Sequence, residues 1–202
     1  EFYQLDLEMS FVTQEDIFQA VEALMIEVFT EFSDWKVVAP FERIPFKEAL
    51  EKYGSDKPDL RFGMLLQDVS EILIDCQLQF ISNVIKGGGT AQALVAPGIA
   101  GKSRKFFDGL DKLIKSQGGG GVAWIAFPED GTIKGSIAKK LSEKEIQSLR
   151  ELPDWAPGCA VLILVGKNVE QTQTRTGLLR GELGKQLDLI EKNVFRFCWI
   201  VD

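Results

Sequence analysis

The chain has 202 residues, 45% of them hydrophobic and 26% charged, which is typical of a globular protein with one large domain or two small ones. Its formal net charge of −7 repels nucleic acid on average, so a nucleic-acid partner would need a local basic patch. The chain contains no histidine, which excludes Ser-His-Asp and Cys-His catalytic sets and any metal site with histidine ligands.

The spacing of the cysteines and the hydropathy of the chain further restrict the class of protein to which it can belong. Cys76, Cys159 and Cys198 are far apart and lack CxxC spacing, which is typical of reduced cysteines in a cytoplasmic protein. The longest apolar run, residues 160–166, is far shorter than the roughly 20 residues of a spanning helix, so we expect no membrane partner. The amino end, EFYQLDLEMSF, has no basic and no apolar region of a signal peptide and starts within a strand-like pattern. The carboxyl end, FRFCWIVD, stops at the end of an apolar run, so we expect a fragment of a longer protein.

The chain opens with a pattern typical of a β-strand. In residues 2–11, FYQLDLEMSF, polar and apolar side chains alternate, as they do in a strand with one face of each kind. Gln4, Asp6 and Glu8 fall on the polar face. Two carboxylates and an amide in this arrangement line the floor of a polar pocket, or they form an ordinary solvated strand face.

Helical periods follow this strand. Thr13 and Asp16 form a variant of the capping box, which predicts an amphipathic helix of about four to five turns. A short strand and a short helix ended by Gly54 come next, followed by the polar turn SDKPDLR. Apolar spacing predicts another helix over residues 65–86, which GGGT ends.

From about residue 90 strands and helices alternate with short connections, which predicts an α/β sandwich near residues 70–182. One helix carries a capping box formed by Ser142 and Glu145. We expect strands over residues 92–96, 122–127 and 159–166, a turn and strand within 129–141, and helices over 102–117, 141–149 and 168–187.

The stretch APGIAGKS, residues 96–103, has the form of a relaxed phosphate-binding P-loop between a strand and a helix. Lys102 and Ser103 are correctly placed, and CWIVD at 198–202 offers an apolar strand ending in Asp. Ala96, however, stands where the strict pattern needs glycine. We therefore favour the alternative, a turn and the start of a helix with Ser103 as its cap.

Two other stretches are far more specific: EFYQLDLEMSF at 1–11 and YGSDKPDLRFGM at 53–64. They resemble the bacterial-type aspartyl-tRNA synthetases, which are class II synthetases. GGGGVAWIAF, GSIAKKLSEKE, RGELGKQLDLIEKNVF and FCWIVD resemble the same family in the same order. The resemblance therefore covers essentially the whole chain.

The resemblance implies an α+β fold. It consists of a piece of the class II antiparallel-sheet core and an inserted two-layer α/β domain of the GAD, DCoH-like type. The implied division is a core segment over residues 1–66, the GAD insertion over 67–182 and a return into the core over 183–202. Motif 1, the motif 2 arginine and motif 3 are absent from these residues, so we expect the fragment alone to be inactive.

The resemblance also implies a reaction. An aspartate–tRNA ligase joins aspartate and ATP to aspartyl-adenylate and transfers the aspartyl group to tRNA. Asp6 would then bind the substrate ammonium, with Gln4 and Glu8 beside the adenylate. The alternative for the 53–64 stretch is a capped surface turn. Residues that would lie at the rim of the active site or near the tRNA are Ser55, Asp56, Lys57 and Arg61.

For the intact enzyme the resemblance implies ATP and Mg²⁺, L-aspartate, a homodimer, and the tRNA for aspartate or also that for asparagine. We expect no cofactor and no metal site in the fragment itself. A second hypothesis is a non-catalytic tRNA-binding or scaffold module, as GAD domains form in the tRNA-dependent amidotransferase. QLDLEMSF favours the synthetase, because an isolated GAD module does not explain it.

Overall fold

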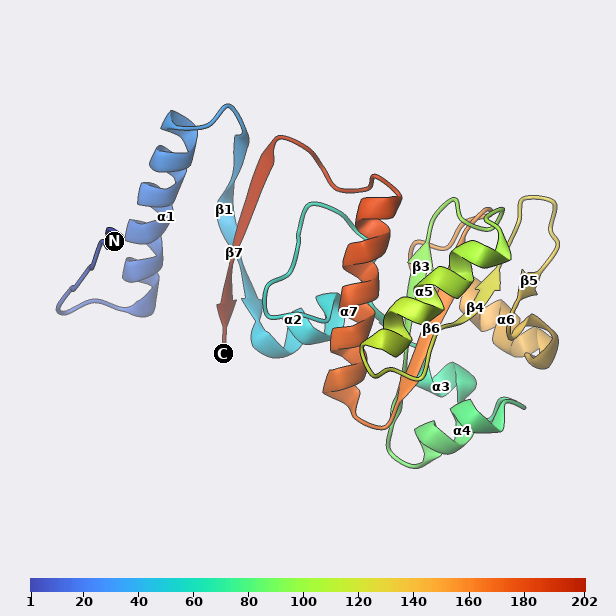
Figure 1. Ribbon diagram of the computed structural model, residues 1–202. Helices are drawn as coiled ribbons and strands as arrows, with labels where there is room; N and C mark the ends of the chain where they lie inside the picture. The colour runs from blue at the N-terminus through green and yellow to red at the C-terminus, as the bar shows by residue number, and fades with distance from the viewer.

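The computed structural model describes all 202 residues and contains two separate β-sheets with helices packed against them (Figure 1). The elements in chain order are α1 (Gln14–Glu31), β1 (Lys36–Pro45), α2 (Phe46–Tyr53), β2 (Gln67–Asp68), α3 (Ser70–Leu73), α4 (Gln79–Lys86), β3 (Thr90–Ala96), α5 (Arg104–Ser116), β4 (Ala123–Ala126), β5 (Lys134–Gly135), the 3-10 helix η1 (Ala138–Lys140), α6 (Glu143–Arg150), β6 (Ala160–Gly166), α7 (Val169–Gln186) and β7 (Val194–Val201).

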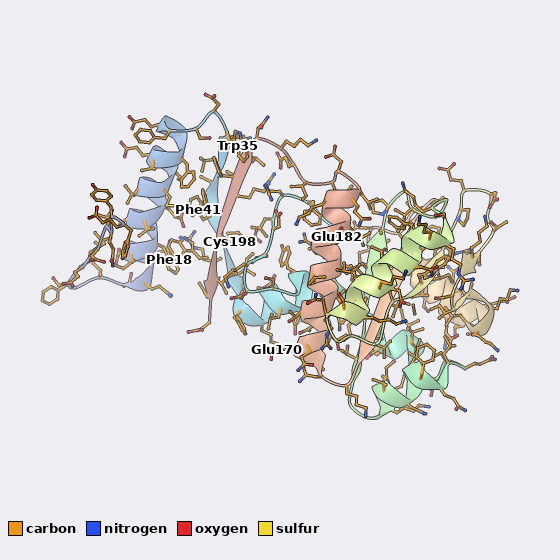
Figure 2. All side chains as sticks on the ribbon, viewed as in Figure 1. Phe18, Trp35, Phe41, Glu170, Glu182 and Cys198 are labelled. Atoms are coloured by element: carbon orange, nitrogen blue, oxygen red, sulfur yellow. The ribbon has the colours of Figure 1, made fainter.

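The smaller sheet joins residues far apart in the chain. β1 and β7 pair in parallel, from Lys36 opposite Val194 to Pro45 opposite Val201, with an irregularity between Val38 and Glu42. α1 covers this pair with aromatic side chains, and Phe18 and Phe41 point into the space between the helix and the strands (Figure 2). The N-terminal helix and the C-terminal strand therefore belong to one packing unit.

The predicted start of α1 at a Thr13–Asp16 capping box and the predicted end of α2 at Gly54 are both confirmed. Thr13 N donates to Asp16 Oδ2 at 2.7 Å and Asp16 N donates to Thr13 Oγ1 at 3.4 Å, which is a complete capping box for α1. α2 ends at Gly54, whose φ of 67° lies in the left-handed region that glycine adopts without a Cβ clash.

The larger sheet has five strands in the order β2-β3-β6-β4-β5, and every neighbouring pair is antiparallel. Leu94 and Leu162 pack with α5 and α7 on one face, whereas Val95 and Val161 pack with α3, α4 and α6 on the other. The α/β sandwich prediction is confirmed. The two-layer prediction is wrong, because helices cover both faces of the sheet.

The predicted strand over residues 2–11 is wrong in this structure. Residues 1–9 have no regular secondary structure (Figure 1), and the side chains of residues 1–16 are exposed. A strand requires a neighbour that accepts and donates its backbone hydrogen bonds, and no other strand of this chain lies alongside the segment. The alternating pattern therefore has no sheet to enter here.

The single helix predicted over residues 65–86 is also wrong, because the chain forms β2, α3 and α4 instead. Gln67 and Asp68 pair with Ala93 and Gln92 of β3, and this pairing competes with the helical conformation. Asp68 Oδ1 then accepts from Ser70 N at 2.8 Å at the start of α3. GGGT does end α4, as predicted, but residues 129–141 form only the two-residue β5 and a 3-10 turn.

Two further observations concern the whole chain. None of the helices combines the length and the apolar character that crossing a bilayer requires. The expected boundary between residues 182 and 183 falls inside α7, which continues to Gln186. The division into three segments stays a prediction.

Candidate functional site

The three N-terminal candidates lie on the exposed segment that precedes α1. Gln4 Nε2 donates to Asp6 Oδ1 at 2.8 Å, and Glu8 has no hydrogen-bond partner in the protein. The segment runs along the side of α1 that faces away from β1 (Figure 1). All three side chains are free to meet a ligand or another part of a protein, but this chain alone does not enclose them in a pocket.

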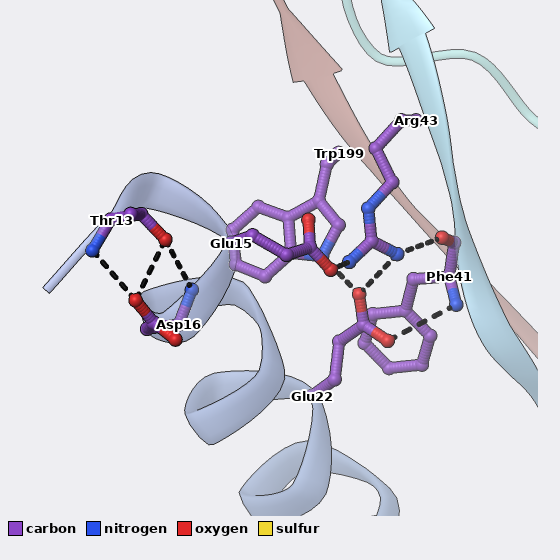
Figure 3. A network of polar contacts seen from close by, with 7 residues as sticks. All are labelled: Thr13, Glu15, Asp16, Glu22, Phe41, Arg43 and Trp199. Atoms are coloured by element: carbon purple, nitrogen blue, oxygen red, sulfur yellow. Dashed lines mark hydrogen bonds and ion pairs between the residues drawn. The ribbon is translucent and has the colours of Figure 1, made fainter.

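A polar network fixes the helix to which this segment is attached (Figure 3). Glu22 is the buried residue of α1, and its Oε1 lies 2.6 Å from Arg43 Nη1 and accepts from Trp199 Nε1 at 2.7 Å. Arg43 also pairs with Glu15 at 2.8 Å. Because the network joins α1 to both β1 and β7, it sets the position from which residues 1–12 extend.

The second group of candidates lies in the turn between α2 and β2. Lys57 N donates to Ser55 Oγ at 3.0 Å, and Lys57 Nζ lies 2.8 Å from Asp56 Oδ2. The hydrogen bond from Lys57 lowers the pKa of the Asp56 carboxyl. The capped-turn geometry predicted for this stretch is confirmed, and Lys57 is the most exposed cation of the turn, with 85% of its side chain accessible.

Arg61 is held more firmly than Lys57. Its Nε and Nη2 donate to the two carboxylate oxygens of Asp59 at 2.9 and 2.7 Å, a bidentate pair. The hydrogen bonds from Arg61 lower the pKa of Asp59, and those same bonds raise the pKa of Arg61. The guanidinium is therefore oriented by its own loop.

A residue that the sequence did not single out organises this loop. Arg180 of α7 is only 2% exposed. Its Nη2 donates to the carbonyl oxygens of Asp59, Phe62 and Gly63 at 3.0, 2.8 and 3.0 Å, and its Nε donates to that of Met64 at 3.2 Å. Its guanidinium carbon also lies 3.9 Å from the centre of the Phe62 ring. The signal available in the sequence was a basic residue on the same helix face as two glycines, since Gly177 lies three residues before Arg180 and Gly184 four residues after it.

The structure does not bring the two predicted groups together. No hydrogen bond or ion pair joins residues 4–8 to residues 55–61, and α1 with the β1–β7 pair lies between them (Figure 1). A cavity of about 380 Å³ between α4 and the larger sheet contains none of the predicted residues. No group of three or more His, Cys, Asp or Glu side chains is arranged to hold a metal ion.

The P-loop-like stretch forms a turn into α5. Gly98 adopts a φ of 68°, Ala100 N donates to Gly158 O at 2.9 Å, and α5 starts at Arg104. Ser103 occupies the N-cap position, but its side chain makes no capping hydrogen bond. The strand before the turn has antiparallel neighbours only, and CWIVD belongs to β7 in the other sheet. The turn-and-helix interpretation is therefore confirmed, and the Walker-B assignment is wrong.

Comparison with known proteins agrees with the resemblance. A family model described as tRNA synthetases class II (D, K and N) matches residues 1–202. The chain is 45% identical over 203 residues to the aspartate–tRNA(Asp/Asn) ligase of Rickettsia akari (strain Hartford). It is 46% identical over 203 residues to the aspartate–tRNA ligase of Streptomyces griseus subsp. griseus.

These comparisons cover 100% of this chain but only 34% and 33% of the two relatives. The chain therefore spans about a third of the length of the curated relatives that it matches. Because the family model covers every residue, the chain belongs to the class II tRNA synthetases of the D, K and N group.

Proposed function

We propose that the chain is a segment of an aspartate–tRNA ligase and supplies part of its catalytic core. The observation that carries this proposal is the identity of about 45% to such ligases over the full length of the chain. The complete enzyme converts aspartate and ATP to aspartyl-adenylate and pyrophosphate. It then transfers the aspartyl group to the terminal ribose of tRNA and releases AMP.

In this proposal Asp6 binds the ammonium group of aspartate, and Gln4 and Glu8 lie beside the adenylate. The exposed carboxylates and the hydrogen bond from Gln4 to Asp6 support it, because an oriented carboxylate suits a cationic substrate group. Catalysis by such a site consists mainly of positioning and charge stabilisation. ATP and Mg²⁺ bind in the complete protein, and magnesium supplies charge neutralisation at the phosphates.

The 55–61 loop is proposed as the rim of the same active site or as a contact to the tRNA acceptor end. Exposed Lys57 is the residue best placed to meet a phosphate, whereas Arg61 is oriented by Asp59. Ser55 and Asp56 stabilise the turn, because they accept hydrogen bonds from the backbone N–H and the side chain of Lys57. The remaining partners in the proposal are L-aspartate and the tRNA for aspartate. The tRNA for asparagine is also included, since the Rickettsia akari relative is an aspartate–tRNA(Asp/Asn) ligase and the Streptomyces griseus relative an aspartate–tRNA ligase.

The domain assignment is part of the same proposal. Residues 1–66 and 183–202 belong to the catalytic core, and residues 67–182 form a GAD-type insertion. The five-stranded antiparallel sheet supports an α/β unit in the 67–182 region, because all of its strands lie within residues 67–166. We also propose a homodimer for the complete enzyme and a cytoplasmic location, which suits three free cysteines.

The test is aspartate-dependent ATP–pyrophosphate exchange by a full-length protein that contains these residues. We expect activity there and none from the 202-residue segment alone. Asp6→Asn should lower kcat/KM for aspartate about 10- to 150-fold, which corresponds to about 1.5–3 kcal/mol for a hydrogen bond to a charged group.

Glu31→Gln is the matched control, because Glu31 is an exposed carboxylate at the far end of α1 with no partner. An intact, folded full-length protein without exchange activity would contradict the proposal. If that protein still bound tRNA, the non-catalytic tRNA-binding module would replace the ligase.

A further inference from the structure

Helix α7 contacts two different parts of the molecule. Leu179 and Leu183 are fully buried in the core of the larger sheet, beside β3 and β6. An adjacent face of the helix carries Gly177, Arg180 and Gly184, which meet residues 53–64. α7 therefore bridges the sheet of the predicted insertion and the loop that carries Lys57 and Arg61.

The glycines bring this loop unusually close to the helix. A Cβ on Gly177 would lie 2.6 Å from Tyr53 O, and one on Gly184 would lie 2.7 Å from the Phe62 ring. Gly54 is the loop residue that faces Gly177 in this contact, and a Cβ added to Gly54 would lie 2.7 Å from Gly177 N. Residues 53–54 are thus in direct backbone contact with α7, and at the other end of the loop the Phe62 ring packs against Gly184 of the helix.

Arg180 lies between these contacts without a carboxylate partner. Its burial lowers its pKa, and no ion pair neutralises it. A buried charge is costly unless polar groups surround it. Here the compensation comes from four backbone carbonyls and from the rings of Phe62 and Tyr53, whose centres lie 3.9 and 5.1 Å from the guanidinium carbon.

These carbonyls converge only when the loop has this conformation. Asp59 makes the connection to the proposed active-site rim: its carbonyl accepts from Arg180 at 3.0 Å, while its carboxylate holds Arg61. A loop released from Arg180 would lose the orientation of Asp59 and with it that of Arg61.

We propose that Arg180 is a positioning residue: it fixes the 55–64 loop on α7 and so couples the sheet of the 67–182 region to the active-site rim. This inference rests on the proposed function for its catalytic consequence, but the positioning of the loop is measurable without any activity.

The first experiment compares Arg180→Lys with Arg175→Lys in the full-length protein. A lysine keeps the charge, but its single ammonium cannot reproduce the planar fork that reaches four carbonyls. Arg175 is the matched control, because it lies on the same helix, is more exposed, and donates only to Gln117 O at 3.1 Å. Hydrogen–deuterium exchange of amides 55–63 should become about tenfold faster or more in Arg180→Lys, while β3 and β6 stay unchanged. Arg175→Lys should leave the loop as it is.

The second experiment measures the catalytic consequence. Arg180→Lys should lower kcat/KM for aminoacylation about tenfold. That loss should shrink in a Lys57→Ala background, because both changes act through the same loop. Gly184→Ala displaces Phe62 without changing any charge, so it should reproduce the faster exchange of the loop if Arg180→Lys does not fold.

Unchanged loop exchange in both variants would overturn the proposal, and so would a loosened loop with full activity or fully additive losses with Lys57→Ala. A wild-type full-length protein that lacks activity would overturn the proposed function instead. In that case the exchange data would still decide whether Arg180 holds the loop.

Discussion

Gly177 and Gly181 lie one turn apart in α7 and allow a matched test of how the helix contacts the loop. Replacing either glycine by alanine gains about 1 kcal/mol of helix propensity. At Gly181 the new Cβ would meet nothing within 4 Å. At Gly177 it would lie 2.6 Å from Tyr53 O and 2.7 Å from Gly54 O, which are backbone atoms that cannot rotate away.

Such overpacking costs about 1–3 kcal/mol. Because the propensity gain is common to both variants, the difference between them isolates this cost. We expect Gly181→Ala to be more stable than the wild type, and Gly177→Ala to be less stable than Gly181→Ala by about 1–3 kcal/mol. With an m-value of about 2 kcal/mol/M, the two urea midpoints should differ by about 0.5–1.5 M.

Urea unfolding followed by circular dichroism and tryptophan fluorescence measures this difference. Gly109→Ala in α5 is a second control, since its Cβ would also meet nothing within 4 Å. Equal midpoints for Gly177→Ala and Gly181→Ala would refute the close backbone contact between α7 and residues 53–54.

Two further predictions concern stability. Glu22→Ala leaves the Trp199 indole N–H without its partner, so it should destabilise the chain by about 1–3 kcal/mol. Glu27→Ala, on the exposed side of α1, is the control and should have little effect. Urea unfolding midpoints of the two variants measure the difference. Because the folded-state pKa of Asp59 is lowered, its contribution to stability is present above its unfolded pKa of about 3.9 and is lost as the pH falls through the folded value. Asp59→Asn should therefore flatten the loss of stability in that acid range, measured as urea midpoints against pH, and an unchanged slope would contradict this.

The parts of the fold that the sequence predicted correctly depend on neighbours in the chain. Thr13 with Asp16 and Ser142 with Glu145 close capping boxes over three residues, and both boxes form. Gly54 ends α2 for an equally local reason. These signals need no knowledge of what the element packs against.

The incorrect predictions concern segments whose structure depends on distant partners. Residues 65–86 carry a helical apolar period, but β3 pairs with residues 67–68 and interrupts it. Residues 2–11 carry a strand period and have no strand beside them. Periodicity indicates which face of an element is apolar, but it does not show whether the partner of that face is present.

The candidate site also contains features that depend on neighbouring residues and features that depend on distant ones. The capped turn at 55–57 was predictable from local chemistry, whereas the roles of Asp6, Gln4 and Glu8 depend on the family resemblance and stay predictions. Arg180 was not predicted, because its acceptors lie 116 to 121 residues away in the sequence. No local pattern shows which loop a helix face will meet.

The charges of the loop explain why lysine is the appropriate replacement for Arg180. Asp56 pairs with Lys57 and Asp59 pairs with Arg61, so the exposed ions of the loop cancel in pairs. Arg180 lies behind the loop and bonds to carbonyls, so it is the one positive charge there without a direct ion pair. A neutral substitution would therefore remove both the anchor of the loop and the charge that an approaching phosphate or carboxylate would sense. Arg180→Lys keeps a basic side chain but cannot reach all four carbonyls at once, so its effect on the loop reports mainly the loss of this positioning.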